Sequence, residues 1–289
     1  MKILVTGANG QLGSEIQKIS KENHSIQYIF TDYAELDITN RNSVKAFFTE
    51  QKPDFLINCA AYTAVDKAEL DFEKAMLLNA DAVANLVESC KICNTIFFHI
   101  STDYVFDGKK PFAYFENDRT NPVSAYGKTK LSGEQNASNY NNTIIIRTSW
   151  LYSAFGNNFV KTMLHLGSER EKIKVVDDQI GSPTYAEDLA NAILKMIEKI
   201  IENPKNMKTG IYHFSNDGQC SWYEFAKEIM KFGNKNCLVE PISTAEYSTL
   251  AQRPQYSLLS KEKIKTDYDV DVPHWKTSLE KCINQLTTS

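Results

Sequence analysis

Short apolar runs alternate along the chain with segments in which apolar residues recur at helical spacing. The apolar runs predict strands over residues 2–6, 25–30, 54–58, 95–100 and 143–147. The amphipathic segments predict helices over 11–19, 43–48 and about 72–90, and a further helix after Pro122 that carries Tyr126 and Lys130. Strands that alternate with helices form βαβ units, so we expect an α/β fold with a Rossmann-type, doubly wound parallel sheet.

The pattern is less regular after Trp150. Helical spacing continues over 156–166, 186–201 and 222–232, strands are expected over 173–176 and 211–214, and 238–273 is mixed. We therefore expect residues 1–150 to form a dinucleotide-binding domain. Residues 151–289 are expected to form mainly a smaller substrate-binding lobe, with elements from roughly 184–215 returning to the first domain.

Composition narrows the class of protein. The net charge of −4 argues against a nucleic-acid binder, because phosphate contacts need clustered Lys and Arg. No apolar run approaches the length of a membrane span, and the chain opens directly on a strand without a leader segment. The six scattered cysteines are expected to be free thiols, and the lone pair Cys90 and Cys93 lacks the partners of a zinc site. These features favour a cytoplasmic protein.

A glycine-rich turn follows the first strand and opens the first helix. Gly7 suits a tight bend, Gly10 allows a pyrophosphate to approach the backbone, and Gly13 lets the helix lie close to the sheet. Glycines also mark plain turns, so the position of this triplet carries the argument. Asp32, just past the second strand, is expected to bind the adenosine ribose and to favour NAD over NADP, although a turn aspartate is an equal alternative.

Tyr126 and Lys130 stand one helical turn apart and therefore on one face of their helix. A tyrosine hydroxyl can protonate a developing alkoxide, and a nearby ammonium is expected to lower the pKa of that tyrosine. Ser101 and Thr102 end the fourth strand, at the sheet edge where ligands bind, so either is expected to hydrogen-bond a substrate carbonyl. A Tyr and a Lys four residues apart also occur by chance on solvated helices. Here the glycine turn, the Ser-Thr pair and the Tyr126–Lys130 pair follow one another on successive βα units, and this order argues against chance.

The sequence resembles the extended short-chain dehydrogenase/reductase family over essentially its whole length. Within that family it is similar to the reductases of nucleotide-linked keto-sugars. The matching stretches are TGANGQLG (6–13), NCAAYTAVDKAE (58–69), STDYVFDG (101–108), SAYGKTKLSGE (124–134), RTSWLY (147–152), GNNFVKTM (156–163), DQIGSPTYAEDLA (178–190) and RPQYSLL (253–259). The first and fourth are shared with the wider superfamily, and the others are more specific.

The resemblance implies a role for each matching residue. Catalysis would fall to Thr102, Tyr126 and Lys130. The cofactor, NADPH or NADH, would be bound by Gly7, Gly10, Gln11, Leu12, Gly13, Asp32, Asp37, Ile38, Ala60, Ala61, Tyr62, Tyr126 and Lys130. The substrate, a dTDP-linked 4-keto-6-deoxy sugar, would be bound by Thr102, Asp103, Trp150 and Arg253. The implied reaction is reduction of the C4 keto group, in the synthesis of cell-surface polysaccharide precursors.

Two departures limit the resemblance. RTSWLY is usually followed by glycine, whereas Ser153-Ala154-Phe155 precedes Gly156 here. Some family members are Mg²⁺-dependent dimers, and Glu15 and Glu187 stand where acidic ligands would be needed. A C-terminal third ligand is not evident, so we expect no metal, an exposed Glu15, and a monomer or homodimer. The alternative functions are a related sugar-nucleotide epimerase and a non-catalytic regulatory subunit with the same fold.

Overall fold

The computed structural model describes residues 1–21 and 25–288, and its centre is a parallel β-sheet. Its strands are β1 (Lys2–Thr6), β2 (Gln27–Thr31), β3 (Phe55–Asn58), β4 (Ile96–Thr102), β5 (Thr143–Thr148) and β10 (Gly210–His213). They lie in the order β10-β5-β4-β3-β1-β2, and every neighbouring pair is parallel. The chain reverses its direction across the sheet between β1 and β3, which is where α/β sheets open a ligand crevice.

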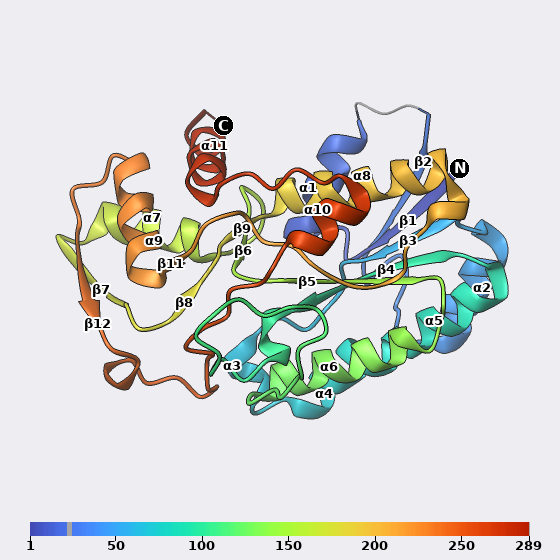
Figure 1. Cartoon of the computed structure of the whole chain (residues 1–289), viewed down its shortest axis with the longest axis horizontal. Coiled ribbons are helices and arrows are strands. Elements are labelled where there is room, and N and C mark those ends of the chain that lie inside the picture. The colour runs from blue at the N-terminus through green and yellow to red at the C-terminus, as the bar shows by residue number, and fades with distance from the viewer. Residues whose placement is uncertain (22–24, 289) are drawn as a thin grey trace.

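Helices cover both faces of this sheet (Figure 1), which confirms the doubly wound α/β fold. One face packs against α1 (Gln11–Ser20), α8 (Ala186–Glu202) and α10 (Glu262–Tyr268). The other face packs against α2 (Arg41–Gln51), α5 (Ala82–Cys93) and α6 (Ala125–Ser138). Aliphatic side chains from the strands fill both interfaces, because a buried parallel sheet is apolar on both sides.

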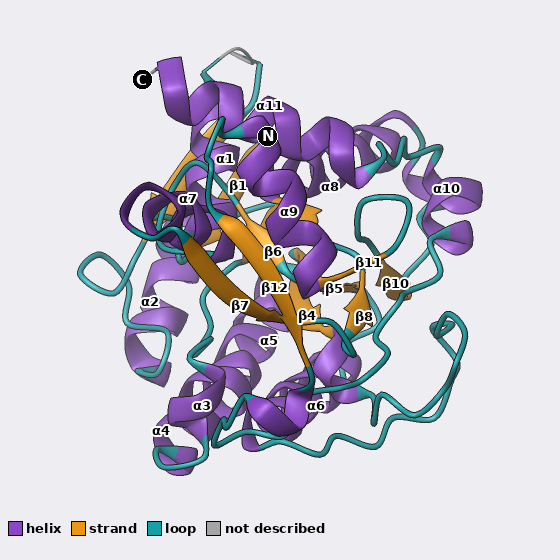
Figure 2. Ribbon diagram, turned by 90° about the vertical axis from the view of Figure 1, so that its left-hand side faces the viewer, coloured by secondary structure: helices purple, strands orange, loops and turns teal. Residues whose placement is uncertain are grey.

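A smaller lobe lies beside the carboxyl ends of the strands (Figures 1 and 2). Its helices are α7 (Phe159–Glu169), α9 (Trp222–Phe232) and α11 (Trp275–Thr288). Its short strands pair as β7 (Lys172–Val176) with β12 (Leu238–Ile242), β6 (Leu151–Tyr152) with β9 (Thr184–Tyr185), and β8 (Ile180–Gly181) with β11 (Cys220–Ser221). The lobe has a separate apolar core. The division of the chain at residue 150 stays a prediction.

Several element boundaries differ from the predicted ones. The predicted strand 25–30 is shorter and later, at Gln27–Thr31, and residues 22–24 before it lie outside the described residues. The helix predicted over 156–166 begins only at Phe159, because Gly156 has a left-handed φ of +64° and Asn158 caps the helix by accepting from the Lys161 N–H. Short helical turns also occur at α3 (Val65–Ala68), η2 (Asp103–Val105), η3 (Pro204–Asn206) and η4 (Thr244–Glu246).

The long helix predicted over about 72–90 is interrupted. It consists of α4 (Phe72–Met76), a π-helical turn η1 (Leu77–Asp81) and α5. A π-helical turn inserts an extra residue into the hydrogen-bond ladder and turns one side chain inward. Here it places Asn79 in the interior, where that residue is almost fully buried.

The described chain contains no helix that is long and apolar enough to cross a membrane.

Candidate active site

A cavity of about 540 Å³ opens above the carboxyl ends of β1, β3, β4 and β5. The sheet, the N-terminus of α1, helix α6 and the smaller lobe all contribute to its walls. Of the residues predicted from the sequence it is lined by Gly10, Gln11, Leu12, Ala61, Thr102, Asp103, Tyr126, Lys130, Trp150 and Arg253. Gly7, Gly13, Asp32, Asp37, Ile38, Ala60 and Tyr62 lie outside this lining.

Helix α6 brings Tyr126 and Lys130 to the cavity. Ser124 caps the helix by accepting a hydrogen bond from the Gly127 N–H, so the helix begins at Ala125. Both side chains are at least nine-tenths buried. The Lys130 ammonium donates to the Ile100 carbonyl oxygen at 2.6 Å, which fixes it against the end of β4.

The pKa of Tyr126 is raised rather than lowered, contrary to the sequence prediction. Burial raises it to about 12, while the neighbouring Thr102 side chain acts in the opposite direction. Burial also lowers the pKa of Lys130 to about 8, against the attraction of the Glu134 carboxylate. Desolvation therefore exceeds the electrostatic support in both groups. At neutral pH the tyrosine is a phenol and the lysine is mostly an ammonium ion.

Ser101 and Thr102 both line the cavity, but the Ser101 hydroxyl is engaged elsewhere. The Ser101 hydroxyl donates to Glu134 Oε1 at 2.5 Å, below the cavity floor. That carboxylate also holds Arg147, at 2.9 Å to Nε and 2.7 Å to Nη2. Successive residues of a strand face opposite sides of the sheet, which explains why only one of the two hydroxyls is available.

Asp103 and Trp150 both lie at the cavity wall, as predicted. Asp103 accepts a hydrogen bond from the Thr102 hydroxyl at 3.0 Å, and burial raises its pKa to about 6. Trp150 has a left-handed φ of 47° and stacks on Trp222 with ring centroids 3.6 Å apart. An L-residue with that backbone is held by its surroundings, and here the stacked indoles hold it.

The glycine turn leaves no room for side chains at two of its three glycines. A Cβ on Gly7 would lie 2.6 Å from Ala60 N, and one on Gly13 would lie 2.6 Å from the Ala8 backbone. Gly10 is different, because a Cβ there would meet only the Gly7 carbonyl oxygen, at 3.2 Å. Gly10 also begins α1 without a side-chain cap. The first N–H groups of α1 therefore face the cavity without a capping acceptor.

Among the residues expected at the adenosine end, Asp32 contacts the glycine turn, whereas Asp37 is bonded within its own loop. Asp32 accepts from the Asn9 N–H at 2.9 Å and from the Tyr33 N–H at 2.8 Å. Asp37 accepts from the Thr39 N–H at 2.9 Å, and Ile38 is buried. Both carboxylate oxygens of Asp32 accept hydrogen bonds from backbone N–H groups, so the side chain stabilises the local structure whether or not it binds a ribose.

Sequence reasoning missed two residues of the site. Asn79 accepts from the Tyr62 N–H at 2.8 Å and donates to the Tyr62 carbonyl oxygen and to the Thr129 hydroxyl. It therefore joins the loop after β3 to helix α6. Trp222 comes from α9, about seventy residues after Trp150 in the chain. Neither residue carries a local signal, because each role depends on a distant contact.

The acidic pair suggested for a metal is engaged by lysines. Glu15 is fully buried, which corrects the expectation of an exposed residue, and it accepts from the Ser153 hydroxyl at 2.6 Å. Ser153 belongs to the atypical segment before Gly156, so that segment contributes to the burial of Glu15. The two oxygens of Glu187 meet Lys18 at 2.8 Å and Lys281 at 2.6 Å. Among the described residues no group of three or more metal-ligating side chains is present.

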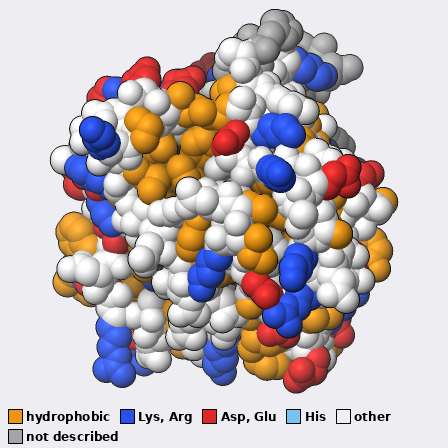
Figure 3. Space-filling model, turned by 90° about the vertical axis from the view of Figure 1, so that its right-hand side faces the viewer, with side chains coloured by type: hydrophobic (Ala, Val, Ile, Leu, Met, Phe, Trp, Pro, Cys, Tyr) orange, Lys and Arg blue, Asp and Glu red, His pale blue; other side chains and the backbone are white. Residues whose placement is uncertain are grey.

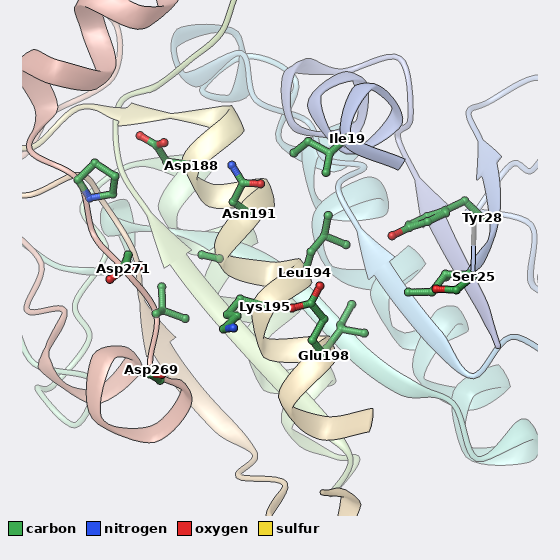
Figure 4. Close-up of a pocket in the computed structure, with 15 residues that line it drawn as sticks. Ile19, Ser25, Tyr28, Asp188, Asn191, Leu194, Lys195, Glu198, Asp269 and Asp271 are labelled. Carbon is green, nitrogen blue, oxygen red and sulfur yellow. The ribbon is translucent and has the colours of Figure 1, made fainter. Parts of the chain in front are cut away.

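A second cavity, of about 710 Å³, lies between α8, the start of β2 and the segment after α10. Figure 4 shows Lys195 and Glu198 of α8 at this cavity, opposite Asp269 and Asp271. Hydrophobic side chains gather on the face of the molecule seen in Figure 3. The cavity of about 710 Å³ contains none of the predicted catalytic residues, so we assign the chemistry to the cavity above β4.

Comparison with known proteins identifies one family. The family described as RmlD substrate binding domain matches residues 1–288. A dTDP-4-dehydrorhamnose reductase of Aggregatibacter actinomycetemcomitans is 42% identical over 96% of this chain and 97% of its own length. A crystal structure of a dTDP-4-dehydrorhamnose reductase from Clostridium acetobutylicum is 44% identical, with a TM-score of 0.93 over 99% of this chain and 100% of that chain. The Bacillus anthracis reductase, solved in complex with NADP, is 42% identical, with a TM-score of 0.91 over 98% and 99%.

Proposed function

The chain belongs to the RmlD substrate binding domain family of dTDP-4-dehydrorhamnose reductases, and from this premise we propose that it reduces dTDP-4-dehydro-L-rhamnose to dTDP-L-rhamnose with NADPH or NADH. The resemblance inferred from the sequence motifs is thereby confirmed. The observation that carries the proposal is the meeting of Thr102, Tyr126 and Lys130 in one cavity with the glycine turn. The product would serve as a precursor of cell-surface polysaccharides.

The residues of the cavity suit a dinucleotide. The uncapped start of α1 and the open space beside Gly10 support a pyrophosphate at that end. Gly7, Gln11, Leu12 and Gly13 would form the turn around it. Asp32, Asp37, Ile38, Ala60, Ala61 and Tyr62 would lie along the adenosine and ribose moieties. When bound, the cofactor supplies the hydride for C4 of the sugar. The NADP complex of the similar B. anthracis protein favours NADPH, and Asp32 leaves NADH as an alternative.

We propose that Tyr126 is the proton donor. Its raised pKa keeps the phenol protonated at neutral pH, as the reductive direction requires, since the keto oxygen gains a proton as C4 gains the hydride. Thr102 would hydrogen-bond the keto oxygen and align it with the phenol. Lys130, held at the end of β4, would stabilise the phenolate that remains and bind the nicotinamide ribose.

The substrate would enter from the side of the smaller lobe. Asp103 and Trp150 would contact the sugar, and Arg253 would contact the diphosphate, because a guanidinium suits phosphate oxygens. The stacked pair Trp150 and Trp222 gives the cavity a rigid apolar wall. Such a wall excludes water from the reacting carbonyl.

The acidic pair Glu15 and Glu187 does not suit a divalent cation as arranged. Lys18 and Lys281 already neutralise Glu187, and Ser153 occupies one oxygen of the buried Glu15. Burial raises the pKa of Glu15, which further disfavours a pair of carboxylates charged for metal binding. We therefore route no step of the reaction through Mg²⁺.

All six cysteines are free, as a reducing compartment would leave them, and we propose that the enzyme works in the cytoplasm.

Cofactor stoichiometry tests the proposal against its alternatives. A reductase consumes one NADPH for each sugar converted, whereas an epimerase returns its hydride and consumes none. A regulatory subunit would bind the nucleotide sugar without turnover. We expect NADPH oxidation to match the amount of dTDP-4-dehydrorhamnose supplied, and conversion of the sugar without loss of NADPH would contradict the proposal.

A further inference from the structure

The chain after β12 runs from the smaller lobe towards α3 (Figure 1) and contributes Arg253 to the wall of the active-site cavity. Residues 247–255, here called the crossing segment, have no helix or strand of their own. The far end of the segment is anchored, because the Tyr256 N–H donates to the Gly108 carbonyl oxygen at 3.1 Å and Tyr256 bridges to Ile180.

Asp66 of α3 anchors the middle of the crossing segment. Its Oδ2 accepts from Arg253 Nη2 at 2.9 Å, and its Oδ1 accepts from the Ala251 N–H at 3.1 Å. Both oxygens of this one carboxylate therefore serve the same short stretch of chain. Together with the Ile180 N–H, which donates to the Gln255 carbonyl oxygen at 2.8 Å, these two contacts hold the arginine in place.

The guanidinium of Arg253 is paired with Asp66 through Nη2. Its Nε is buried and has no hydrogen-bond partner among the described residues. The same residue lines the active-site cavity and a neighbouring pocket of about 140 Å³. Arg253 therefore stands at the wall of the active-site cavity, where a guanidinium suits phosphate oxygens.

The turn that holds Arg253 also holds the catalytic helix. Glu69 follows α3 directly, and its Oε1 accepts from the Ala125 N–H at 2.8 Å. Ala125 is the residue before Tyr126. The carboxylates of Asp66 and Glu69, three residues apart, thus hold Arg253 and the start of α6 in fixed positions relative to each other.

We propose that Asp66 is a positioning residue for the nucleotide sugar, holding the Arg253 guanidinium at the cavity wall where it meets the diphosphate. The inference rests on the proposed function, since it takes a nucleoside diphosphate as the ligand. The opposite role is competition, in which the Asp66 carboxylate would have to be displaced by phosphate. The two roles differ in sign, because loss of the Asp66 charge weakens binding in the first case and strengthens it in the second.

The test is Asp66→Asn, assayed for dTDP-4-dehydrorhamnose and NADPH separately. We expect the KM for the sugar to rise about fivefold, the upper range for a partly exposed ion pair. The kcat and the KM for NADPH should stay within about twofold of wild type, since the reacting groups are untouched. In an Arg253→Gln background the same change should have no further effect on the KM for the sugar.

Asp267→Asn is the matched control. Asp267 likewise joins one cation, Lys208 at 2.6 Å, and one neutral donor, the Tyr212 hydroxyl at 3.0 Å, but it lies outside the active-site cavity. The Asp267→Asn substitution should leave the KM for the sugar and the KM for NADPH unchanged. A lower KM for the sugar in Asp66→Asn, or an equal rise in the Arg253→Gln background, would overturn the positioning role.

Calorimetric titration with dTDP separates this inference from the proposed function. Weaker binding of dTDP to Asp66→Asn supports positioning even if the wild-type protein fails to oxidise NADPH with this sugar. Unchanged dTDP binding in Asp66→Asn overturns the inference while leaving the reductase assignment intact.

Discussion

The buried ion pair below the active site should be a main determinant of stability. Glu134 and Arg147 are only 3% and 2% exposed, and the carboxylate also accepts from Ser101. Glu134→Gln would leave the Arg147 guanidinium buried without a counter-charge. Removing one partner of such a pair costs roughly 3–5 kcal/mol, so we expect the free energy of unfolding to fall by about that amount.

Urea denaturation measures this loss, and a second ion pair provides the control. Arg41 and Glu88 have the same two-point geometry, with both nitrogen–oxygen distances at 2.6 Å, but they are 68% and 41% exposed. Glu88→Gln should have little or no effect, because solvent screens the exposed pair. Equal losses in Glu134→Gln and Glu88→Gln would refute the argument that burial decides the difference. The double change Glu134→Leu with Arg147→Met should regain most of the loss.

The same substitution should also shift the pH dependence of catalysis. The Glu134 carboxylate raises the pKa of Lys130 against the effect of burial, which on balance leaves it at about 8. Without that charge the pKa of Lys130 should fall further. The alkaline loss of kcat/KM in Glu134→Gln should therefore begin at a lower pH than in the wild-type protein.

Three further predictions follow from the site. Tyr126→Phe should lower kcat by about 10²- to 10⁴-fold in NADPH oxidation assays while NADPH binding by fluorescence is unchanged, and full turnover would exclude Tyr126 as the proton donor. In the wild-type protein kcat/KM should fall as the pH rises through about 8, because Lys130 loses its charge there while Tyr126, with a pKa of about 12, stays protonated; a rate that rises through this range would contradict the role of the ammonium. EDTA should change neither the activity nor the mass measured by light scattering, because lysines already neutralise Glu187. A loss of activity in EDTA that added Mg²⁺ restores would show that a metal is required.

The sequence predicted those parts of the site that depend on local spacing. Gly7, Gly10 and Gly13 occur within one turn, and Tyr126 and Lys130 within one helical repeat, so their proximity needs no tertiary information.

The remaining parts depend on contacts between distant segments. The burial of Glu15 results from Ser153 and the neighbouring α8, which helical periodicity in α1 does not reveal. Trp222 lies outside every matching stretch, and Asp66, although it lies within the stretch 58–69, carries no local signal for its contact with Arg253. The direction of the Tyr126 pKa was wrong for a related reason, because spacing gives the distance to Lys130 but not the extent of burial.

The central claim is that this chain transfers a hydride to C4 of a dTDP-linked keto-sugar while Tyr126 protonates the oxygen. The most direct measurement supplies NADPH deuterated at both C4 positions of the nicotinamide with dTDP-4-dehydrorhamnose and analyses the product by NMR. The account predicts dTDP-rhamnose with deuterium at C4 of the sugar, formed at a greatly reduced rate by Tyr126→Phe. A product without deuterium at C4, or with deuterium at another carbon, would contradict it.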